Sequence, residues 1–285
     1  MSNLQNLSTS ISVGDGGARA EAVVNALLQG SAPFLVTRTG NVEARAIAGG
    51  GATRELRYSA GWYCRDAAAE ADVFQDWATR YVAALRHSNL VMIVPSQRND
   101  CQPLLDSVRL APDVCVDTMQ LAALVRFLAE ISRTKKRVLV INSKVELMKS
   151  QAAKFSDLFP DSGISAAFPE RLTYLKSSDT YPGHEPGASW SETFQQLCNS
   201  VDQIDFDLAL LGCGCYGLPL CDHIFSMRRR SAFYVGGFIQ LLFGILGKRW
   251  LSREREKAFF NDHWIRVPAE MVPTNAEHFE GGAYW

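Results

Sequence analysis

The sequence predicts an α/β protein in which helices cover both faces of a doubly wound, mostly parallel sheet. Short apolar runs alternate with longer segments of helical composition along most of the chain, which is the pattern of successive βαβ units. The clearest unit spans residues 207–250, DLALLGCGCYGLPLCDHIFSMRRRSAFYVGGFIQLLFGILGKRW. In it, an apolar run ends at glycines, a helix follows, and a second apolar run ends at another glycine pair. Such turns lie at the carboxyl edge of a parallel sheet, where ligands bind.

The predicted strands are apolar runs that end at a turn residue, a proline or a polar cluster. They cover residues 33–37, 89–94, 138–141, 173–178, 208–211 and 232–235. The predicted helices, whose apolar residues recur at helical spacing, cover residues 18–28, 70–86, 121–131, 145–155, 190–201 and 218–227. A further helix after Glu43 is expected to end at the glycines 49–51. Strands that alternate with helices in this order give a Rossmann-like sheet.

We expect residues 17–285 to form one α/β domain, preceded by a flexible segment at residues 1–16. The length of 285 residues suits one large α/β domain or two small ones. A boundary or insertion would fall within residues 145–190. Residues 179–190 form a loop rich in proline and glycine that is either a lid or a connector.

The composition excludes a strong global attraction to nucleic acids or to anionic membranes. The formal net charge is −1, and 47% of the residues are hydrophobic and 21% charged, as in an ordinary folded protein with a core. The N-terminus lacks the pattern of a signal peptide. The longest apolar stretch, residues 233–246, is interrupted by glycines and is shorter than the ~20 residues that span a bilayer. We therefore expect a cytoplasmic protein without a nucleic-acid partner or a transmembrane segment.

The seven cysteines are expected to be buried thiols. Their odd number and scattered positions do not form a disulfide framework. Cys213, Cys215 and Cys221, with Asp222 and His223, are the one cluster that resembles a zinc site. No second ligand pair follows at the usual spacing, so a zinc site is the weaker interpretation.

Arg38 and Glu43 are the first candidate functional residues, and both belong to the loop after the first predicted strand. Arginine binds phosphate in a bidentate manner, and glutamate can bind a hydroxyl group or a metal ion. We therefore expect Arg38 and Glu43 to be catalytic and the neighbouring Gly40 and Asn41 to bind substrate. The alternative is a surface ion pair between Arg38 and Glu43.

The glycine turns and the residues that follow them form the second candidate group, which we expect to bind substrate. Its members are Gly212, Gly214, Tyr216, Gly217, Gly236, Gly237, Gln240, Lys248 and Arg249. The backbone of the turns would approach a diphosphate, the cations would offset its charge, and Tyr216 would contact a sugar or base. Packing roles for these residues are the alternative. The three glycines 212, 214 and 217 also match the spacing of a dinucleotide fingerprint, but no acidic residue ends the next strand, so NAD binding is the weaker interpretation.

These motifs resemble those of bacterial proteins with the GT-D-type glycosyltransferase fold. The resemblance is carried by R-x-G-x-x-E at residues 38–43, by the block at residues 207–250, and by HWIR at 263–266 followed by EGGAYW at 280–285. Together they touch most of the chain from residue 33 to its end. The resemblance implies a GT-D-like fold and a transferase that moves a sugar from a nucleotide-sugar donor to a glycan or another acceptor, as in the assembly of surface polysaccharides.

The resemblance also implies a divalent cation, Mn²⁺ or Mg²⁺, held by an Asp-x-Glu sequence in the early motif. Here that sequence reads Asn41, Val42 and Glu43, so Glu43 is the expected metal ligand and the site lacks a second charge. If the reaction inverts, another carboxylate would deprotonate the acceptor, and Glu185 and Asp222 are candidates. The alternative function is an inactive nucleotide- or sugar-binding protein of the same fold. Both functions are compatible with a homo-oligomer.

Overall fold

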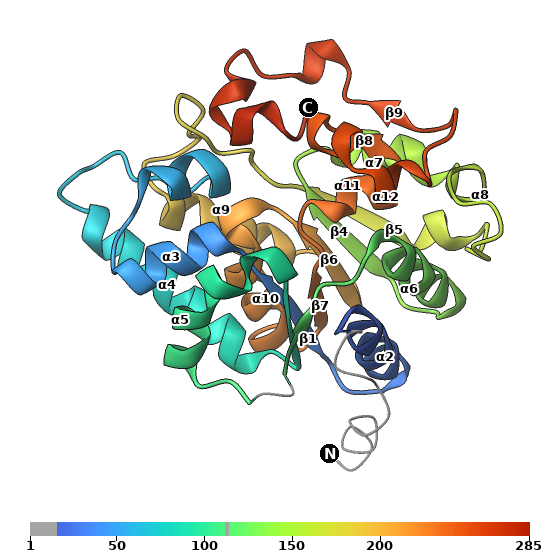
Figure 1. Cartoon of the computed structure of the whole chain (residues 1–285), viewed down its shortest axis with the longest axis horizontal. Helices are drawn as coiled ribbons and strands as arrows, with labels where there is room; N and C mark the ends of the chain where they lie inside the picture. Colours follow the sequence, from blue (N-terminus) through green and yellow to red (C-terminus); the bar gives the residue numbers. More distant parts are fainter. Residues whose placement is uncertain (1–15, 112–113) are drawn as a thin grey trace.

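A parallel sheet of seven strands forms the centre of the computed structural model, which describes residues 16–111 and 114–285 (Figure 1). The strands are β1 (Leu35–Thr39), β2 (Leu90–Ile93), β3 (Cys115–Asp117), β4 (Val138–Asn142), β5 (Leu172–Lys176), β6 (Leu208–Gly212) and β7 (Ser231–Tyr234). Their order in the sheet is β3-β2-β1-β7-β6-β4-β5. Every neighbouring pair is parallel. The predicted doubly wound α/β fold is confirmed, and this sheet is parallel throughout.

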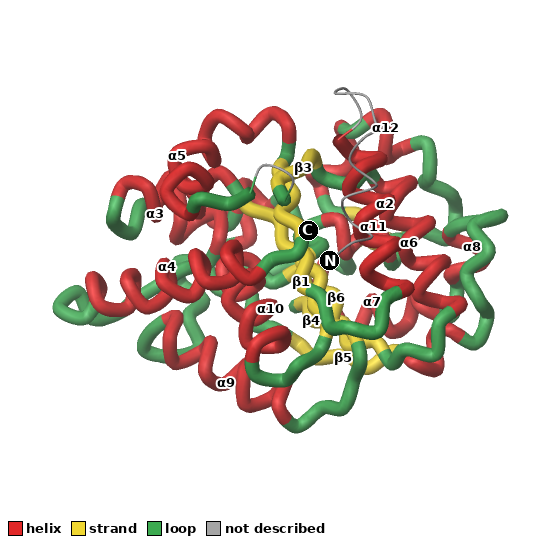
Figure 2. The backbone as a smooth tube through the Cα atoms, turned by 90° about the horizontal axis from the view of Figure 1, so that it is seen from below, coloured by secondary structure: helices red, strands yellow, loops and turns green. Residues whose placement is uncertain are grey.

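Helices cover both faces of the sheet, so the strands form a central band between two helical layers (Figure 2). One face is covered by α3 (Asn41–Gly49), α4 (Glu70–His87), α5 (Arg98–Val108), α9 (Trp190–Asp202) and α10 (Gly217–Ser226). The other face is covered by α2 (Gly16–Gln29), α6 (Leu121–Arg133), α7 (Val145–Ala152), α8 (Phe155–Leu158) and α11 (Phe238–Leu242).

Each strand divides its side chains between two hydrophobic cores, because successive residues point to opposite faces. On β4, Leu139 and Ile141 join the core beneath α4 and α10, whereas Val138 and Val140 join the core beneath α6 and α11. Both faces are buried, which explains why the strand appears in the sequence as a continuous apolar run.

The winding of the sheet reverses between β1 and β7. After β1 the chain enters α3 on one face, and after β7 it enters α11 on the other. Loops that leave adjacent strands toward opposite faces open a crevice outside the carboxyl ends of those strands. The reversal therefore places a crevice at the carboxyl ends of β1 and β7.

The end of the chain runs along the carboxyl edge of the sheet, beside α7 and α11 (Figure 1). There β8 (Ile245–Leu246) pairs in parallel with β9 (Ile265–Arg266), and α12 (Glu254–Lys257) lies between them in sequence. The main-chain N–H of Lys248 donates to the carbonyl of Trp285 at 2.8 Å, and that of Arg249 donates to Ala283 at 3.1 Å. These bonds hold the last residues beside the loop that follows β8.

The six predicted strands and five of the six predicted helices agree with the structure to within two residues. The prediction of one helix at residues 145–155 is wrong, because α7 ends at Ala152 and α8 begins at Phe155. The break turns Phe155 into the core, where it stacks on Phe168 with 5.9 Å between ring centroids. Helix α5, strand β3 and helix α11 were not predicted. Helix α5 contains Pro103, a residue that normally interrupts a helix.

Residues 145–190 contribute β5 to the main sheet, and the end of the loop 179–190 is hydrogen-bonded to the segment before α4. The main-chain N–H of Trp190 donates to Tyr63 at 2.9 Å, and that of Arg65 donates to Ala188 at 3.0 Å. The expected flexible segment, residues 1–16, lies outside the described residues except for Gly16, which begins α2. No helix in the described part of the chain combines the length and apolar character that a membrane crossing requires. All seven cysteines are free thiols, and all but Cys115 are buried.

Candidate functional site

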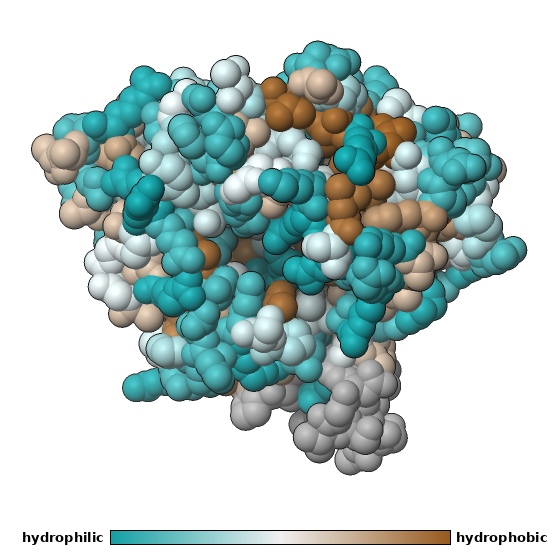
Figure 3. Space-filling model, turned by 45° about the horizontal axis from the view of Figure 1, so that its top comes forward, coloured by the Kyte–Doolittle hydropathy of each residue, from teal (hydrophilic) through white to brown (hydrophobic). Residues whose placement is uncertain are grey.

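A cavity of about 270 Å³ lies at the carboxyl edge of the sheet, outside the ends of β1, β7, β6 and β4. Figure 3 shows the surface hollowed near the centre of its view, with mostly hydrophilic residues around the hollow. The cavity spans the point where the winding reverses, which is the ordinary ligand position in an open α/β sheet. Its walls come from loops that are far apart in the sequence.

Glu43 lies in the first turn of α3 and points into the cavity. Its carboxylate folds back over Gly40, so closely that a Cβ atom at Gly40 would lie 2.2 Å from Oε2 of Glu43. Burial raises the pKa of Glu43, whereas its own main-chain N–H and the charge of Arg38 lower it less. The main-chain N–H of Gly40 donates to the hydroxyl of Tyr81 at 3.3 Å. Gly40 therefore gives room to Glu43, and its N–H already has a partner in the protein.

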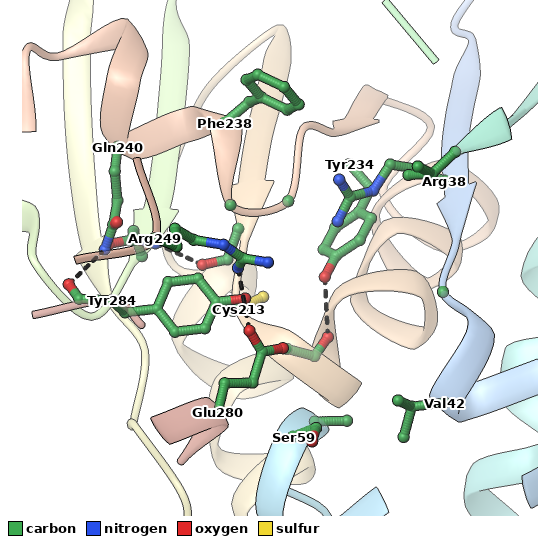
Figure 4. A pocket seen from close by; sticks show the side chains of 18 of the residues that line it. Arg38, Val42, Ser59, Cys213, Tyr234, Phe238, Gln240, Arg249, Glu280 and Tyr284 are labelled. Atoms are coloured by element: carbon green, nitrogen blue, oxygen red, sulfur yellow. Dashed lines mark hydrogen bonds and ion pairs between the residues drawn. The ribbon is translucent and has the colours of Figure 1, made fainter. Parts of the chain in front are cut away.

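Arg38 extends from β1 across the glycine turn after β7. A Cβ atom at Gly236 would lie 2.3 Å from Nη2 of Arg38, and the guanidinium carbon lies 5.9 Å from the ring centroid of Tyr234. Figure 4 shows this arrangement beside the cavity. Within residues 16–111 and 114–285, no carboxylate forms an ion pair with Arg38, although Lys144 and Arg249 have such partners. The predicted surface ion pair between Arg38 and Glu43 is therefore not formed.

The predicted glycines divide into two groups. Gly212, Gly214, Gly236 and Gly237 line the cavity, and Gly217 does not. At Gly217 a Cβ atom would lie 2.0 Å from the ring of Tyr234, so this glycine allows α10 to pack against β7. The main-chain N–H of Gly236 donates to the carbonyl of Leu211 at 3.0 Å. Part of the glycine pattern therefore serves packing within the protein.

The remaining predicted residues differ in how they face the cavity. Tyr216 is buried and stacks on Trp190 with 5.7 Å between ring centroids. Gln240 is buried, and its Nε2 donates to the carbonyl of Tyr284 at 3.4 Å. Both line the cavity, as does Arg249. Lys248 does not line it, and its side chain is exposed.

The residues around Glu43 do not fit a divalent cation. Nδ2 of Asn41 donates to Asp100 at 3.2 Å, and Asp100 also accepts from Arg45 at 2.7 Å. The Asn41 amide therefore bonds to the ion pair of Arg45 and Asp100, and neither of these two residues lines the cavity. In the part of the chain that the structure describes, no three His, Cys, Asp or Glu residues are grouped as metal ligands. This includes the cysteines near His223, so the zinc interpretation gains no support.

Neither predicted candidate for a general base lies at the cavity. Asp222 is in α10, where its carboxylate contacts Nδ1 of His87 at 2.6 Å. Glu185 lies 3.9 Å from Arg65 in the loop before α9. Neither residue lines the cavity. Glu43 is therefore a better candidate than either of them for accepting a proton there.

Several cavity residues were missed by the sequence analysis. Lys144 is buried two residues after β4, with Nζ 3.5 Å from Asp179 and 4.6 Å from the ring centroid of Trp285. Burial lowers the pKa of Lys144, and Asp179 opposes this shift. Glu280 and Tyr284 come from the closing motif. The position of Lys144 just after a strand was a usable signal, whereas nothing in the sequence placed Glu280 beside Arg249.

A comparison of the chain with models of protein families, with curated proteins and with solved structures finds no match.

Proposed function

We propose that this protein is a glycosyltransferase that binds a nucleotide-sugar donor in the cavity at the carboxyl edge of the sheet. The observation that carries the proposal is Arg38, an arginine without a carboxylate partner among the described residues, at the point where the winding reverses. Phosphates of nucleotides bind at this position in related architectures. A free guanidinium group there offers two parallel hydrogen bonds to a phosphate. The resemblance of the motifs to GT-D-type proteins supports the same class.

The mixed charge of the cavity also supports a sugar phosphate. The cations are Arg38, Lys144, Arg249 and Arg253, and the carboxylates are Glu43, Asp179, Glu256 and Glu280. A diphosphate needs the cations, and sugar hydroxyl groups are bound well by carboxylate acceptors. A pocket for a purely apolar ligand would not gather eight charged side chains of both signs, because each is costly to remove from water.

In the proposed reaction, an acceptor hydroxyl oxygen forms a bond to the anomeric carbon of the donor. The bond between that carbon and the diphosphate oxygen breaks, and the electron pair stays on the leaving diphosphate. Arg38 stabilises this charge. Glu43 takes the hydroxyl proton, a role suited to a carboxylate whose pKa is raised by burial.

The test is hydrolysis of a panel of nucleotide-sugars, with water as the acceptor, measured as the release of nucleoside diphosphate. We expect one donor to be hydrolysed, Arg38→Ala to raise its KM and lower kcat, and Glu43→Gln to lower kcat at unchanged KM. Arg86→Ala, which removes an exposed arginine of α4, is the matched control. The proposal would be contradicted if the wild-type protein hydrolysed no donor, or if the Arg38 and Glu43 variants hydrolysed the donor as fast as the wild-type protein does.

The second candidate is a nucleotide- or sugar-binding protein without transferase activity, favoured by the contact of Asn41 with Asp100. The double variant Asn41→Asp/Asp100→Asn exchanges the two groups and keeps a hydrogen bond between them. A transferase limited by metal binding should gain Mn²⁺-dependent hydrolysis in this variant, whereas Asp100→Asn alone should not. A binding protein should still bind a nucleotide-sugar and hydrolyse none with any variant.

A further inference from the structure

Glu280 and Arg249 form an ion pair at the wall of the cavity. Oε2 of Glu280 lies 3.1 Å from Nη1 of Arg249, and about a quarter of each side chain is exposed, 26% and 28% respectively. Figure 4 shows the two side chains pointing toward one another, with Arg38 on the far side over Tyr234. Three arginines line the cavity, and among the described residues only Arg249 has a carboxylate partner, whereas Arg38 and the exposed Arg253 have none.

Arg249 is held in place independently of Glu280. Its guanidinium carbon lies 5.4 Å from the ring centroid of Trp250 and 4.8 Å from that of Tyr284. Its main-chain N–H donates to Ala283 at 3.1 Å. The neighbouring Gly237 has no side chain, and a Cβ atom there would lie 3.4 Å from Nη1. Without the Glu280 carboxylate, Arg249 would therefore stay in position next to Gly237, which has no side chain to cover it.

Glu280 occupies an unusual backbone conformation. Its φ angle is +47°, in the left-handed region that a residue with a side chain rarely adopts, and Gly281 and Gly282 follow with φ of +63° and +78°. Such a conformation persists where surrounding contacts enforce it. The two glycines can change conformation at little steric expense. The carboxylate can therefore leave Arg249 without unfolding the helices or the sheet.

We propose that Arg249 is a second anion subsite of the cavity, and that Glu280 is its internal occupant, which a phosphate of the ligand replaces. The inference rests on the proposed function, because it assigns the two phosphates of a nucleoside diphosphate to Arg38 and Arg249. Glu280 then competes with the ligand in the free protein. A ligand with only one anionic group gains less, since it must displace the carboxylate without also engaging Arg38.

The test is isothermal titration of inorganic pyrophosphate and of nucleoside diphosphates into wild-type protein and Glu280→Gln. We expect the variant to bind both kinds of ligand about tenfold more tightly, because one ion pair no longer has to be broken. Glu277→Gln removes an exposed carboxylate of the same segment and should change affinity by less than about twofold, as expected for a solvent-screened charge. Arg249→Gln/Glu280→Gln should lose the gain. If Glu280→Gln does not fold, Glu280→Gly replaces it in the test, because glycine suits the left-handed backbone. It should show the same gain in affinity.

The outcomes separate this inference from the proposed function. If wild-type protein binds a nucleoside diphosphate and removal of the Glu280 carboxylate leaves its affinity unchanged or weaker, the inference fails and the proposed function stands. If the Glu280 variants gain affinity for pyrophosphate but no nucleotide-sugar binds or is hydrolysed, the inference stands and the proposed function fails. If folded wild-type and variant proteins bind no anion, both are overturned.

Discussion

Glu43 is a carboxylate that the fold holds in an environment unfavourable to its charge. Burial raises its pKa, Glu280 raises it further, and Arg38 and its own main-chain N–H compensate only in part. Groups of this kind are common at sites that perform chemistry, where stability is lower than the fold could provide. The stability of the protein should therefore depend on the charge of Glu43.

We expect Glu43→Gln to raise the melting temperature at pH 7.5 by about 2–4 °C, the change that about 1 kcal/mol produces in a chain of this size. Since the folded-state pKa of Glu43 lies above 4.5, the folded protein binds the proton more tightly than the unfolded chain does. Stability consequently falls as the pH rises from about 4.5 through the raised pKa, and it stays lower at neutral pH. Thermal unfolding from pH 4 to pH 8 measures the effect.

The difference in melting temperature between Glu43→Gln and wild-type protein should shrink toward pH 4, where Glu43 is mostly protonated in both the folded and the unfolded chain. Glu277→Gln removes an exposed carboxylate and should leave the melting temperature unchanged from pH 4 to pH 8. A melting temperature of Glu43→Gln that is lower than wild type at pH 7.5 would show that the charge of Glu43 stabilises the fold.

At the scale of elements, the glycine turns have two roles that the sequence pattern does not separate. Gly214 and Gly236 adopt φ angles of +54° and +65°, which favour glycine. Gly217 has an ordinary helical conformation and is required because α10 packs directly on Tyr234. A missing side chain permits close approach of a ligand and close packing of a helix equally well. The fingerprint spacing therefore predicted the place of the turn and not the role of each glycine.

Gly217→Ala should destabilise the protein by about 1–3 kcal/mol, as overpacking of a core usually does. The added methyl group would lie 2.0 Å from the ring of Tyr234, which is buried and forms a wall of the cavity. Gly49→Ala is the matched control, because a methyl group there, at the end of α3, would meet no neighbouring side chain or loop within 4 Å. That change should be neutral or stabilise the helix by up to about 1 kcal/mol. Urea unfolding measures the free energy of unfolding of both variants, and equal values for the two would contradict the packing role of Gly217.

The strands were predictable because both faces of the sheet are buried and each strand is an apolar run. Helix α5 was not, because its apolar residues are interrupted by polar side chains and Pro103. Arg38 and Glu43 were found because they follow the predicted strand 33–37, although Arg38 is itself the fourth residue of β1. The same reasoning would have found Lys144 after β4. Glu280 lies in a loop, where no hydrophobic period indicates what a side chain faces.

At the scale of the whole molecule, the strand order creates the cavity. The loops after β1 and β7 meet because these strands are neighbours, although they are separated in sequence by five other strands. The closing segment adds Glu280 and Tyr284 from the end of the chain. Hydrophobic patterning predicts that a parallel sheet exists, but it leaves the order of the strands open. The motifs could thus be found in the sequence, while their meeting required the fold.

The most direct test of the central claim is isothermal titration of nucleoside diphosphates and nucleotide-sugars into wild-type protein, Arg38→Ala and Arg86→Ala. We predict that one nucleoside diphosphate and its sugar conjugate bind wild-type protein and Arg86→Ala equally well. Arg38→Ala should weaken both at least about tenfold, since it removes hydrogen bonds to a charged phosphate. Absence of binding to folded wild-type protein, or equal binding by Arg38→Ala, would contradict the assignment of this cavity as a donor site.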